Sequence, residues 1–217
     1  MDAIIKEGDI LFLDTGVIFG YAAENDTFST ICKDFFFTYK NKMITCKYIT
    51  DKELPKLLER RRILREEVRI KLWDSSFQIG RSPKLKQRDI DIGNKLCKLK
   101  NQQGMTAEKI YSMLHKIDTT IEQRVKFILD NHISESVLLI EKINIKLRDH
   151  IHAGLGNFDD ANIMASALQH NSVSALKVIT TDNNDWPKVH EIMKTYKEKC
   201  DVPEIYYIKD LKIEKIS

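Results

Sequence analysis

Several features that define common protein classes are missing from this sequence. Only four of its 217 residues are cysteines, and they form neither a CxxC pair nor the spacing of a zinc ribbon. No apolar run reaches the ~18 residues of a membrane-spanning helix. Met1 to Gly8 carry two acids and no apolar core of a signal peptide. We therefore expect a cytoplasmic protein with reduced thiols and without a membrane partner.

Two signatures of phosphoryl-transfer enzymes are also missing. No Gly-rich loop ends in Gly-Lys-Ser/Thr, as a P-loop would. No Asp-x-Asp pair follows the first predicted strand, although phosphatases with an aspartate nucleophile carry one there. The sequence has a net charge of +3 and is 42% hydrophobic, which is typical of a globular protein with a sizeable core. A net charge of this size permits a polyanionic partner without demanding one.

Short apolar runs alternate with helical patterns at both ends of the chain. The run ILFL at 10–13 ends in Asp14 and is typical of a strand buried on both faces. Further strands are predicted at 43–49, 177–181 and 204–208, with helices between them. This alternation predicts an α/β fold in which a central four-stranded parallel sheet lies between two layers of helices.

The middle of the chain is predicted to be helical throughout. Helices are expected at about 84–102, 106–131 and 135–152, so that 59–156 forms a large all-helical insertion within a single domain of residues 1–217. One helix carries apolar residues every three or four positions, which predicts a seam that packs on another helix. Docking of another subunit, including a second copy of this chain, is the alternative use of this seam. The seam consists of Ile110, Leu114, Ile117, Ile121, Val125 and Ile128.

Acidic residues recur where a parallel sheet would gather them. Asp14 and Asp182 each close a predicted strand, whereas Glu53 and Asp160, with Asp159 beside it, lie in the first turns of predicted helices. Strands that are parallel end at one edge of the sheet, and the helices next to them begin there. We therefore expect these carboxylates to lie close together at the carboxyl edge.

Each of these acids also has a purely structural explanation. Asp14 could cap a helix that begins near Thr15, and Thr50 with Glu53 could form a capping box. Asn157 to Asp160 could be a second helix cap, and Asp182 could belong to a polar turn. However, clustered anions repel one another in a partly desolvated cleft unless a cation neutralises them. One cation site explains the cluster better than four independent structural roles.

All-oxygen ligands favour hard cations, so we expect Mg²⁺ or Mn²⁺ as the cofactor of this edge. Such an ion lowers the pKa of a bound water and polarises a phosphoryl oxygen. A carboxylate cluster of this kind therefore predicts hydrolysis of phosphodiesters by an activated water, without a nucleophilic side chain.

Four stretches of the sequence resemble, in order, the motifs of PIN-domain nucleases: LFLDTGVIFGY, ITDKEL, DDANIMASAL and VITTDNNDW. The second is similar to the toxin branch of that family. The third resembles Asp-Ala-x-Ile-x-Ala-x-Ala, which assigns the family's acid to Asp160 and leaves Asp159 as an extra. The fourth resembles Thr-x-Asp followed by a second acid and an aromatic residue, here Asp182, Asp185 and Trp186, with one more residue between the acids than the commonest form.

The resemblance implies a metal-dependent endoribonuclease that acts mostly on single-stranded RNA. It makes Asp14, Glu53, Asp160 and Asp182 both catalytic residues and metal ligands, and it makes Asp159 and Asp185 further candidate ligands. A toxin of a toxin–antitoxin or defence system is one form that such an enzyme takes, with an antitoxin or another protein bound through the helical insertion. One alternative is a PIN-like subunit with little activity that serves in nucleic-acid binding or as a scaffold. A second alternative is another Mg²⁺-dependent phosphoryl hydrolase.

The segment that follows Glu53 is strongly basic. Between Lys56 and Lys100 there are 14 basic and six acidic residues. Because this segment begins beside the predicted acidic edge, we expect some of its cations to hold the phosphates of RNA. The alternative is a solvated helix face with scattered charges. The predicted phosphate-binding residues are Arg60, Arg61, Arg62 and Arg65.

Overall fold

A parallel sheet of five strands lies at the centre of the structure, a computed structural model that describes residues 5–24, 26–198 and 200–211. The strand order is β3-β2-β1-β4-β5, and every pair of neighbours is parallel. Leu11, Phe12 and Leu13 are fully buried, which is the burial expected of a central strand covered on both faces. The strands are β1 (Ile10–Leu13), β2 (Lys42–Cys46), β3 (Ile133–Val137), β4 (Leu176–Thr180) and β5 (Glu204–Tyr207).

The predicted α/β class is confirmed, but the prediction of four strands is wrong. The additional strand is β3, which pairs with β2 at one edge of the sheet. It falls where the sequence predicts a helix over 135–152, and it means that segment 59–156 is not all-helical. Its sequence ISESV has apolar residues only at its two ends, and both of these are buried. A strand this short and polar becomes recognisable only through its pairing partner.

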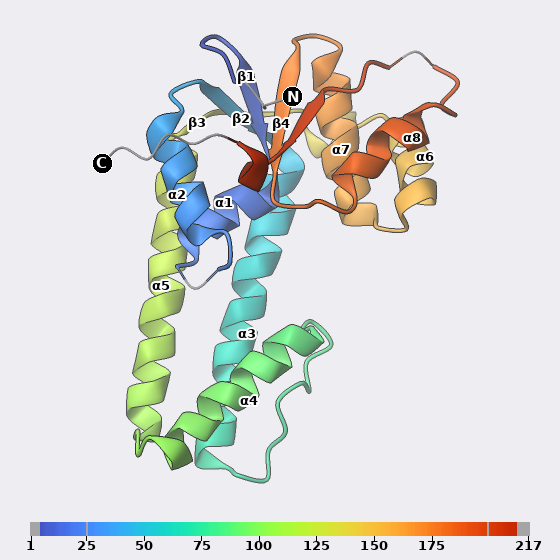
Figure 1. Cartoon of the computed structure of the whole chain (residues 1–217). Coiled ribbons are helices and arrows are strands. Elements are labelled where there is room, and N and C mark those ends of the chain that lie inside the picture. Colours follow the sequence, from blue (N-terminus) through green and yellow to red (C-terminus); the bar gives the residue numbers. More distant parts are fainter. Residues whose placement is uncertain (1–4, 25, 199, 212–217) are drawn as a thin grey trace. The chain divides into compact units, whose positions relative to one another are not determined.

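The chain divides into two compact units. The first, here called the sheet unit, comprises Met1–Leu54 and Arg124–Ser217, and the second, here called the helical unit, comprises Pro55–Gln123. Within the sheet unit, helices cover both faces of the sheet (Figure 1). Its complete helices are α1 (Thr15–Ala22), α2 (Ser29–Thr38), α6 (Ile145–Leu155), α7 (Phe158–Asn171) and α8 (Val189–Met193).

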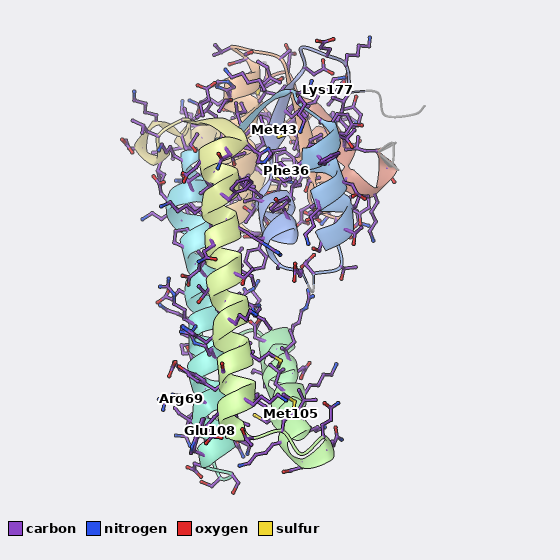
Figure 2. The ribbon with its side chains drawn as sticks, turned by 90° about the vertical axis from the view of Figure 1, so that its left-hand side faces the viewer. Phe36, Met43, Arg69, Met105, Glu108 and Lys177 are labelled. Atoms are coloured by element: carbon purple, nitrogen blue, oxygen red, sulfur yellow. The ribbon has the colours of Figure 1, made fainter. Side chains whose placement is uncertain are left out.

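The helical unit contains most of α3 (Leu54–Trp73), all of α4 (Gln87–Gln102) and much of α5 (Ala107–Asn131). Figure 2 labels Arg69 on α3 and Glu108 on α5 at the same end of this unit. Buried apolar side chains from all parts of the unit form its own core. These are Leu64, Val68, Leu72, Ile79, Leu85, Ala107, Ile110 and Leu114.

The core of the helical unit accounts for part of the apolar seam. Ile110 and Leu114 pack within this core, and Ile121, Val125 and Ile128 are also buried in the chain itself. The prediction that this helix packs on another helix is thus confirmed within one molecule. Ile117 is the one member of the predicted seam that is only partly buried. None of the described helices is long and apolar enough to cross a membrane.

Candidate functional site

The sheet reverses its winding direction between β1 and β4. Strand β1 pairs with β2 on one side and with β4 on the other, so the connections that follow β1 and precede β4 lead to opposite sides of β1. In open α/β sheets, ligands bind at the carboxyl ends of the strands beside such a switch point. Asp14 follows β1 directly and Asp182 follows β4 after two residues. The switch point therefore places two of the predicted acids at the same edge of the sheet.

Asp14 is held across this switch point by hydrogen bonds. Its backbone N–H donates to the carbonyl of Ile179 over 3.1 Å, and the hydroxyl of Thr180 donates to its Oδ2 over 2.7 Å. The side chain of Trp186 acts in the same direction as the Thr180 hydrogen bond and lowers the pKa of the Asp14 carboxyl. Asp14 is buried, and this burial raises the pKa of its carboxyl, with an added contribution from the negative charge of Asp182.

Asp14 is also the N-cap residue of α1. Its Oδ1 accepts a hydrogen bond of 2.7 Å from the backbone N–H of Thr15. The structural explanation of this residue is therefore correct, but it uses only one carboxylate oxygen. A helix cap functions at an exposed position, so capping does not explain why this carboxylate is buried beside another acid.

Gly16 lets the start of α1 approach the end of β4. A Cβ atom at this position would lie 1.9 Å from the hydroxyl oxygen of Thr181 and 3.2 Å from its Cβ. A side chain at position 16 would force the Thr181 side chain to move, so glycine permits this close approach. The residues that follow β1 and β4 thereby lie close together, and no motif in the sequence indicated this contact.

Asp160 lies close enough to several other carboxylates for their negative charges to raise its pKa. It lies in the first turn of α7, where the N-cap residue Asn157 donates a hydrogen bond to its Oδ2. The pKa of Asp160 is raised to about 7, first by burial and then by the negative charges of Asp14, Asp185, Asp182 and Glu53. The structure thus brings together carboxylates from four separate segments of the chain. We call these five residues the acidic edge.

Asp182 and Asp185 both belong to the turn that follows β4. Asp182 accepts hydrogen bonds from the backbone N–H groups of Asn184 over 2.8 Å and of Asp185 over 3.1 Å. The polar-turn explanation of Asp182 therefore holds in addition to its place on the acidic edge. Asp185 forms an ion pair of 2.7 Å with Lys188.

Glu53 ends a π-helical turn, Ile49–Glu53, that leads directly into α3. The helix begins before Thr50, because Tyr48 occupies the N-cap position and has helical backbone angles. The hydroxyl of Thr50 donates to Asp51 rather than acting as a helix cap. The capping box predicted as the structural role of Glu53 thus does not begin this helix. π-Helical turns are rare and often occur at functional sites.

Asp159 contacts Tyr48, which is not among the predicted site residues. The hydroxyl of Tyr48 donates to its Oδ1 over 2.7 Å. Burial and this hydrogen bond raise the pKa of Tyr48, and the nearby charge of Glu53 adds to the shift. Asp159 therefore links α7 to the segment that carries Glu53. The position of Tyr48, two residues before the Thr50 motif, was the only sequence signal for this contact.

The acidic edge has the oxygen atoms and the negative charge of a site for a hard cation. Its side chains, however, do not converge on a common point in this structure. Among the described residues, no three His, Cys, Asp or Glu side chains are placed so that they could hold a metal ion. The atoms that could bind a metal ion are nevertheless all carboxylate oxygens. Several of them accept hydrogen bonds from neutral N–H groups that a cation could displace. The hydroxyl of Thr15, next to Asp14, is buried without a hydrogen-bond partner. The residues therefore fit Mg²⁺ or Mn²⁺ in charge and donor type, after rotation of carboxylate side chains.

The predicted phosphate-binding arginines are paired with acids of their own unit. Arg60 contacts Asp89 at 3.2 Å, and Arg62 contacts Glu122 at 2.8 Å. Arg61 and Arg65 contact the same buried acid, Asp118, at 3.0 and 3.3 Å. Only the side chain of Arg62 is more than half exposed, at 56%. RNA binding by these residues stays a prediction, and for the other three it would require breaking ion pairs that are largely shielded from water.

Comparison of this chain with protein-family models, with curated proteins and with solved structures finds no match. The likeness to PIN-domain nucleases therefore remains a resemblance of sequence motifs.

Proposed function

We propose that this protein is a Mg²⁺- or Mn²⁺-dependent endoribonuclease of the PIN type, which hydrolyses phosphodiesters of mostly single-stranded RNA. The observation that carries this proposal is the acidic edge, where four other carboxylates help to raise the pKa of Asp160 to about 7. Like charges that oppose one another in a crevice weaken the fold, and such perturbed groups gather at functional sites. A bound cation would remove this repulsion.

Asp14, Glu53, Asp160 and Asp182 would hold the ion, with Asp185 close enough to contribute. When bound there, the ion supplies an activated water and polarises a phosphoryl oxygen. The surrounding residues keep the acids in place: Thr180 and the backbone N–H of Thr15 fix Asp14, Asn157 holds Asp160, and Tyr48 holds Asp159 outside the five-residue edge. The acids lie at the switch point of the sheet, where open α/β folds bind their ligands, and the scissile phosphate would bind at this edge.

The proposal is tested by cleavage of a mixed pool of single-stranded RNA with Mg²⁺, with Mn²⁺ and with EDTA. We expect cleavage with either metal and none with EDTA. In Asp14→Asn we expect cleavage to fall by about 100-fold or more, because the change removes a charged ligand of the metal ion that activates the water. Asparagine can still cap α1, so the variant should fold.

A matched control is Asp51→Asn, which makes the same chemical change at an exposed acid two residues from Glu53. This variant should cleave RNA at the wild-type rate. Cleavage that persists in EDTA, or full activity in folded Asp14→Asn, would overturn the proposal.

A further inference from the structure

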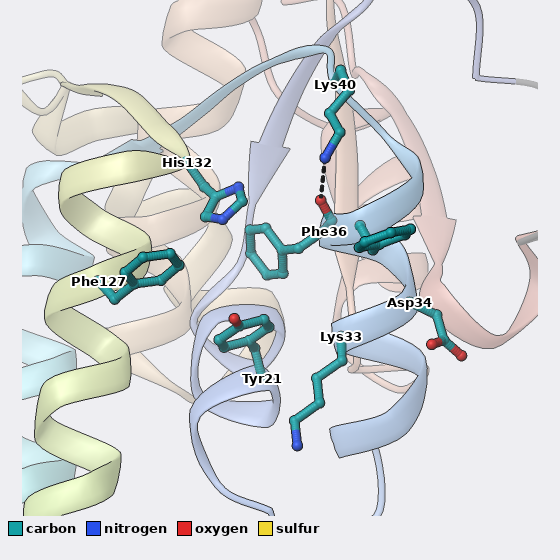
Figure 3. A pocket seen from close by; sticks show the side chains of 8 residues that line it. Tyr21, Lys33, Asp34, Phe36, Lys40, Phe127 and His132 are labelled. Carbon is teal, nitrogen blue, oxygen red and sulfur yellow. Dashed lines mark hydrogen bonds between the residues drawn. The ribbon is translucent and has the colours of Figure 1, made fainter. Parts of the chain in front are cut away.

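A cavity of about 400 Å³ opens on the sheet unit away from the residues of the acidic edge, with which it shares no side chain. Its walls come from α1, from α2 and from the C-terminal part of α5 with the residue that follows it (Figure 3). We call it the aromatic pocket, because five of its eight lining residues have aromatic rings. The lining residues are Tyr21, Lys33, Asp34, Phe36, Phe37, Lys40, Phe127 and His132.

The rings of the aromatic pocket form a connected series. Phe36 packs edge-to-face against Tyr21 and against His132, with 5.2 Å between ring centroids in both pairs. Phe127 packs in the same way against His132 at 5.6 Å. Edge-to-face packing of this kind fixes the orientation of each ring. The pocket therefore offers walls of defined shape rather than mobile aliphatic side chains.

Two of the rings remain exposed to solvent although both are large and apolar. Phe37 on α2 is 62% exposed and Phe127 on α5 is 48% exposed. Exposed apolar side chains that meet at a hollow, and come from different elements, are typical of a ligand-binding surface.

Two lysines and one aspartate line the pocket, Lys33, Lys40 and Asp34. Lys40 lies 5.5 Å from the centroid of the Phe37 ring, and among the described residues no carboxylate forms an ion pair with it. Lys33 pairs with Glu24 only at 3.5 Å, and Asp34 points away from Tyr21, Phe127 and His132 in Figure 3. Flat apolar walls beside a lysine suit a ligand that joins a planar ring to an anion.

We propose that the aromatic pocket binds a nucleotide, with the base stacked against the exposed rings of Phe37 and Phe127 and the phosphate beside Lys40. Base stacking on aromatic side chains is tolerant of sequence, and a lysine nearby holds the backbone. The nucleotide is either a unit of an RNA strand or a free mononucleotide. The first source rests on the proposed function, because it makes the pocket a binding site for the RNA that is cleaved.

The test measures binding of AMP, of UMP and of a short labelled single-stranded RNA in EDTA, so that binding is read without cleavage. Phe37→Ala and Phe127→Ala should each weaken binding by about fivefold or more, which is the lower end of the effect of one base stack. Both rings are exposed, so the variants should fold, as circular dichroism can check. Ile145→Ala is the matched control, because Ile145 is also 62% exposed on the sheet unit and lies outside the pocket. It should bind like the wild type.

A second variant tests the charge. Lys40→Glu should lower the slope of log affinity against log salt by about 0.7, the value of one phosphate contact on a single strand. Lys197→Glu, which reverses an exposed lysine of the same unit outside the pocket, should leave the slope unchanged.

The results distinguish an RNA strand from a free mononucleotide as the ligand. They also distinguish failure of the nucleotide pocket from failure of the nuclease function. Binding of RNA without binding of mononucleotides assigns the pocket to the RNA strand, whereas binding of both assigns it to free nucleotides. If the wild type binds neither, or the pocket variants bind as well as the controls, the nucleotide proposal is overturned even where RNA cleavage is intact. If the pocket variants lose binding and the wild type cleaves no RNA, the proposed nuclease function fails and the pocket proposal stands. Loss of a dimer in Phe127→Ala by light scattering, with unchanged nucleotide binding, would mark the surface as a protein contact instead.

Discussion

Both units of this protein bury acidic side chains, but the buried Asp118 of the helical unit is paired with arginines, whereas the buried Asp14 of the sheet unit lies near another acid. In the helical unit, Asp118 contacts Arg61 and Arg65, and Glu67 accepts hydrogen bonds from the backbone N–H groups of Gly80, Arg81 and Ser82. In the sheet unit, burial and the negative charges of other acids raise the carboxyl pKa of Asp14 and of Asp160. Buried charges with partners serve the fold, whereas buried charges that oppose one another indicate a ligand.

The largest effect on stability should come from breaking the arrangement in the helical unit. Asp118→Asn leaves Arg61 and Arg65 without their shared counter-charge, and both are largely shielded from water. Removing one partner of such a buried group should lower the free energy of unfolding by about 3 kcal/mol. Urea denaturation measures this loss. RNA cleavage per folded molecule should not change, and a loss of cleavage with intact stability would contradict the comparison.

A smaller effect, on activity alone, should follow from Glu53→Gln. The change keeps the volume of the side chain and removes one negative charge from the acidic edge. If Glu53 holds or orients a metal ion, cleavage at matched Mg²⁺ should fall by about tenfold, equivalent to ~1.4 kcal/mol. Steady-state cleavage rates measure it. Wild-type rates in Glu53→Gln would remove this residue from the site and leave it a structural role.

The free energy of unfolding should depend on pH because the carboxylates of the acidic edge repel one another when they are ionised. The pKa of Asp160 is raised to about 7 from an ordinary value of 3.8, so the folded protein binds a proton here that the unfolded chain has released. The free energy of unfolding in EDTA should therefore decrease as pH rises through about 4 to 7. Mg²⁺ should restore more stability at about pH 8 than at about pH 5, because cation binding needs the ionised form.

Asp160→Asn provides the control for this pH dependence. With no carboxyl at position 160, the decrease between about pH 4 and 7 should become shallower, and the additional stability from Mg²⁺ should shrink. Urea denaturation at a series of pH values measures both. A decrease as steep as in the wild type would show that other groups cause it.

The smallest effect should come from the arginines of the helical unit. Arg62→Gln should reduce the salt dependence of RNA binding by at most about 0.7 in the log–log slope, because Arg62 has the most exposed side chain of the four. Arg65→Gln should leave the slope unchanged, since the Arg65 side chain is only 15% exposed and is paired with Asp118. Filter binding over a range of salt concentrations measures both slopes. A larger change of the slope in Arg65→Gln would show that the helical unit contributes to RNA binding.

Local patterns in the sequence determined the α/β class, the first strand with Asp14 at its end and the long helices of the middle segment. These features follow from the spacing of apolar residues along a few turns or a few strand positions, which can be read without knowledge of the fold. The same reasoning could place acids at the ends of strands and the beginnings of helices. It also predicted that Asp14, Glu53, Asp160 and Asp182 lie close together, but it could not show that Asp159 instead accepts a hydrogen bond from Tyr48.

The tertiary structure decided the features that depend on distant partners. Strand β3 exists because it pairs with β2, some 90 residues earlier in the chain, as the contact between Ser134 and Met43 shows at a separation of 91 residues. The hydrogen bond from Thr180 to Asp14 joins residues 166 positions apart, and the raised pKa of Asp160 depends on burial that only the folded chain creates. The arginines likewise look free in the sequence, because their partners Asp118 and Glu122 lie on another helix. Desolvation and charge pairing are properties of neighbours in space, and a sequence pattern records only neighbours along the chain.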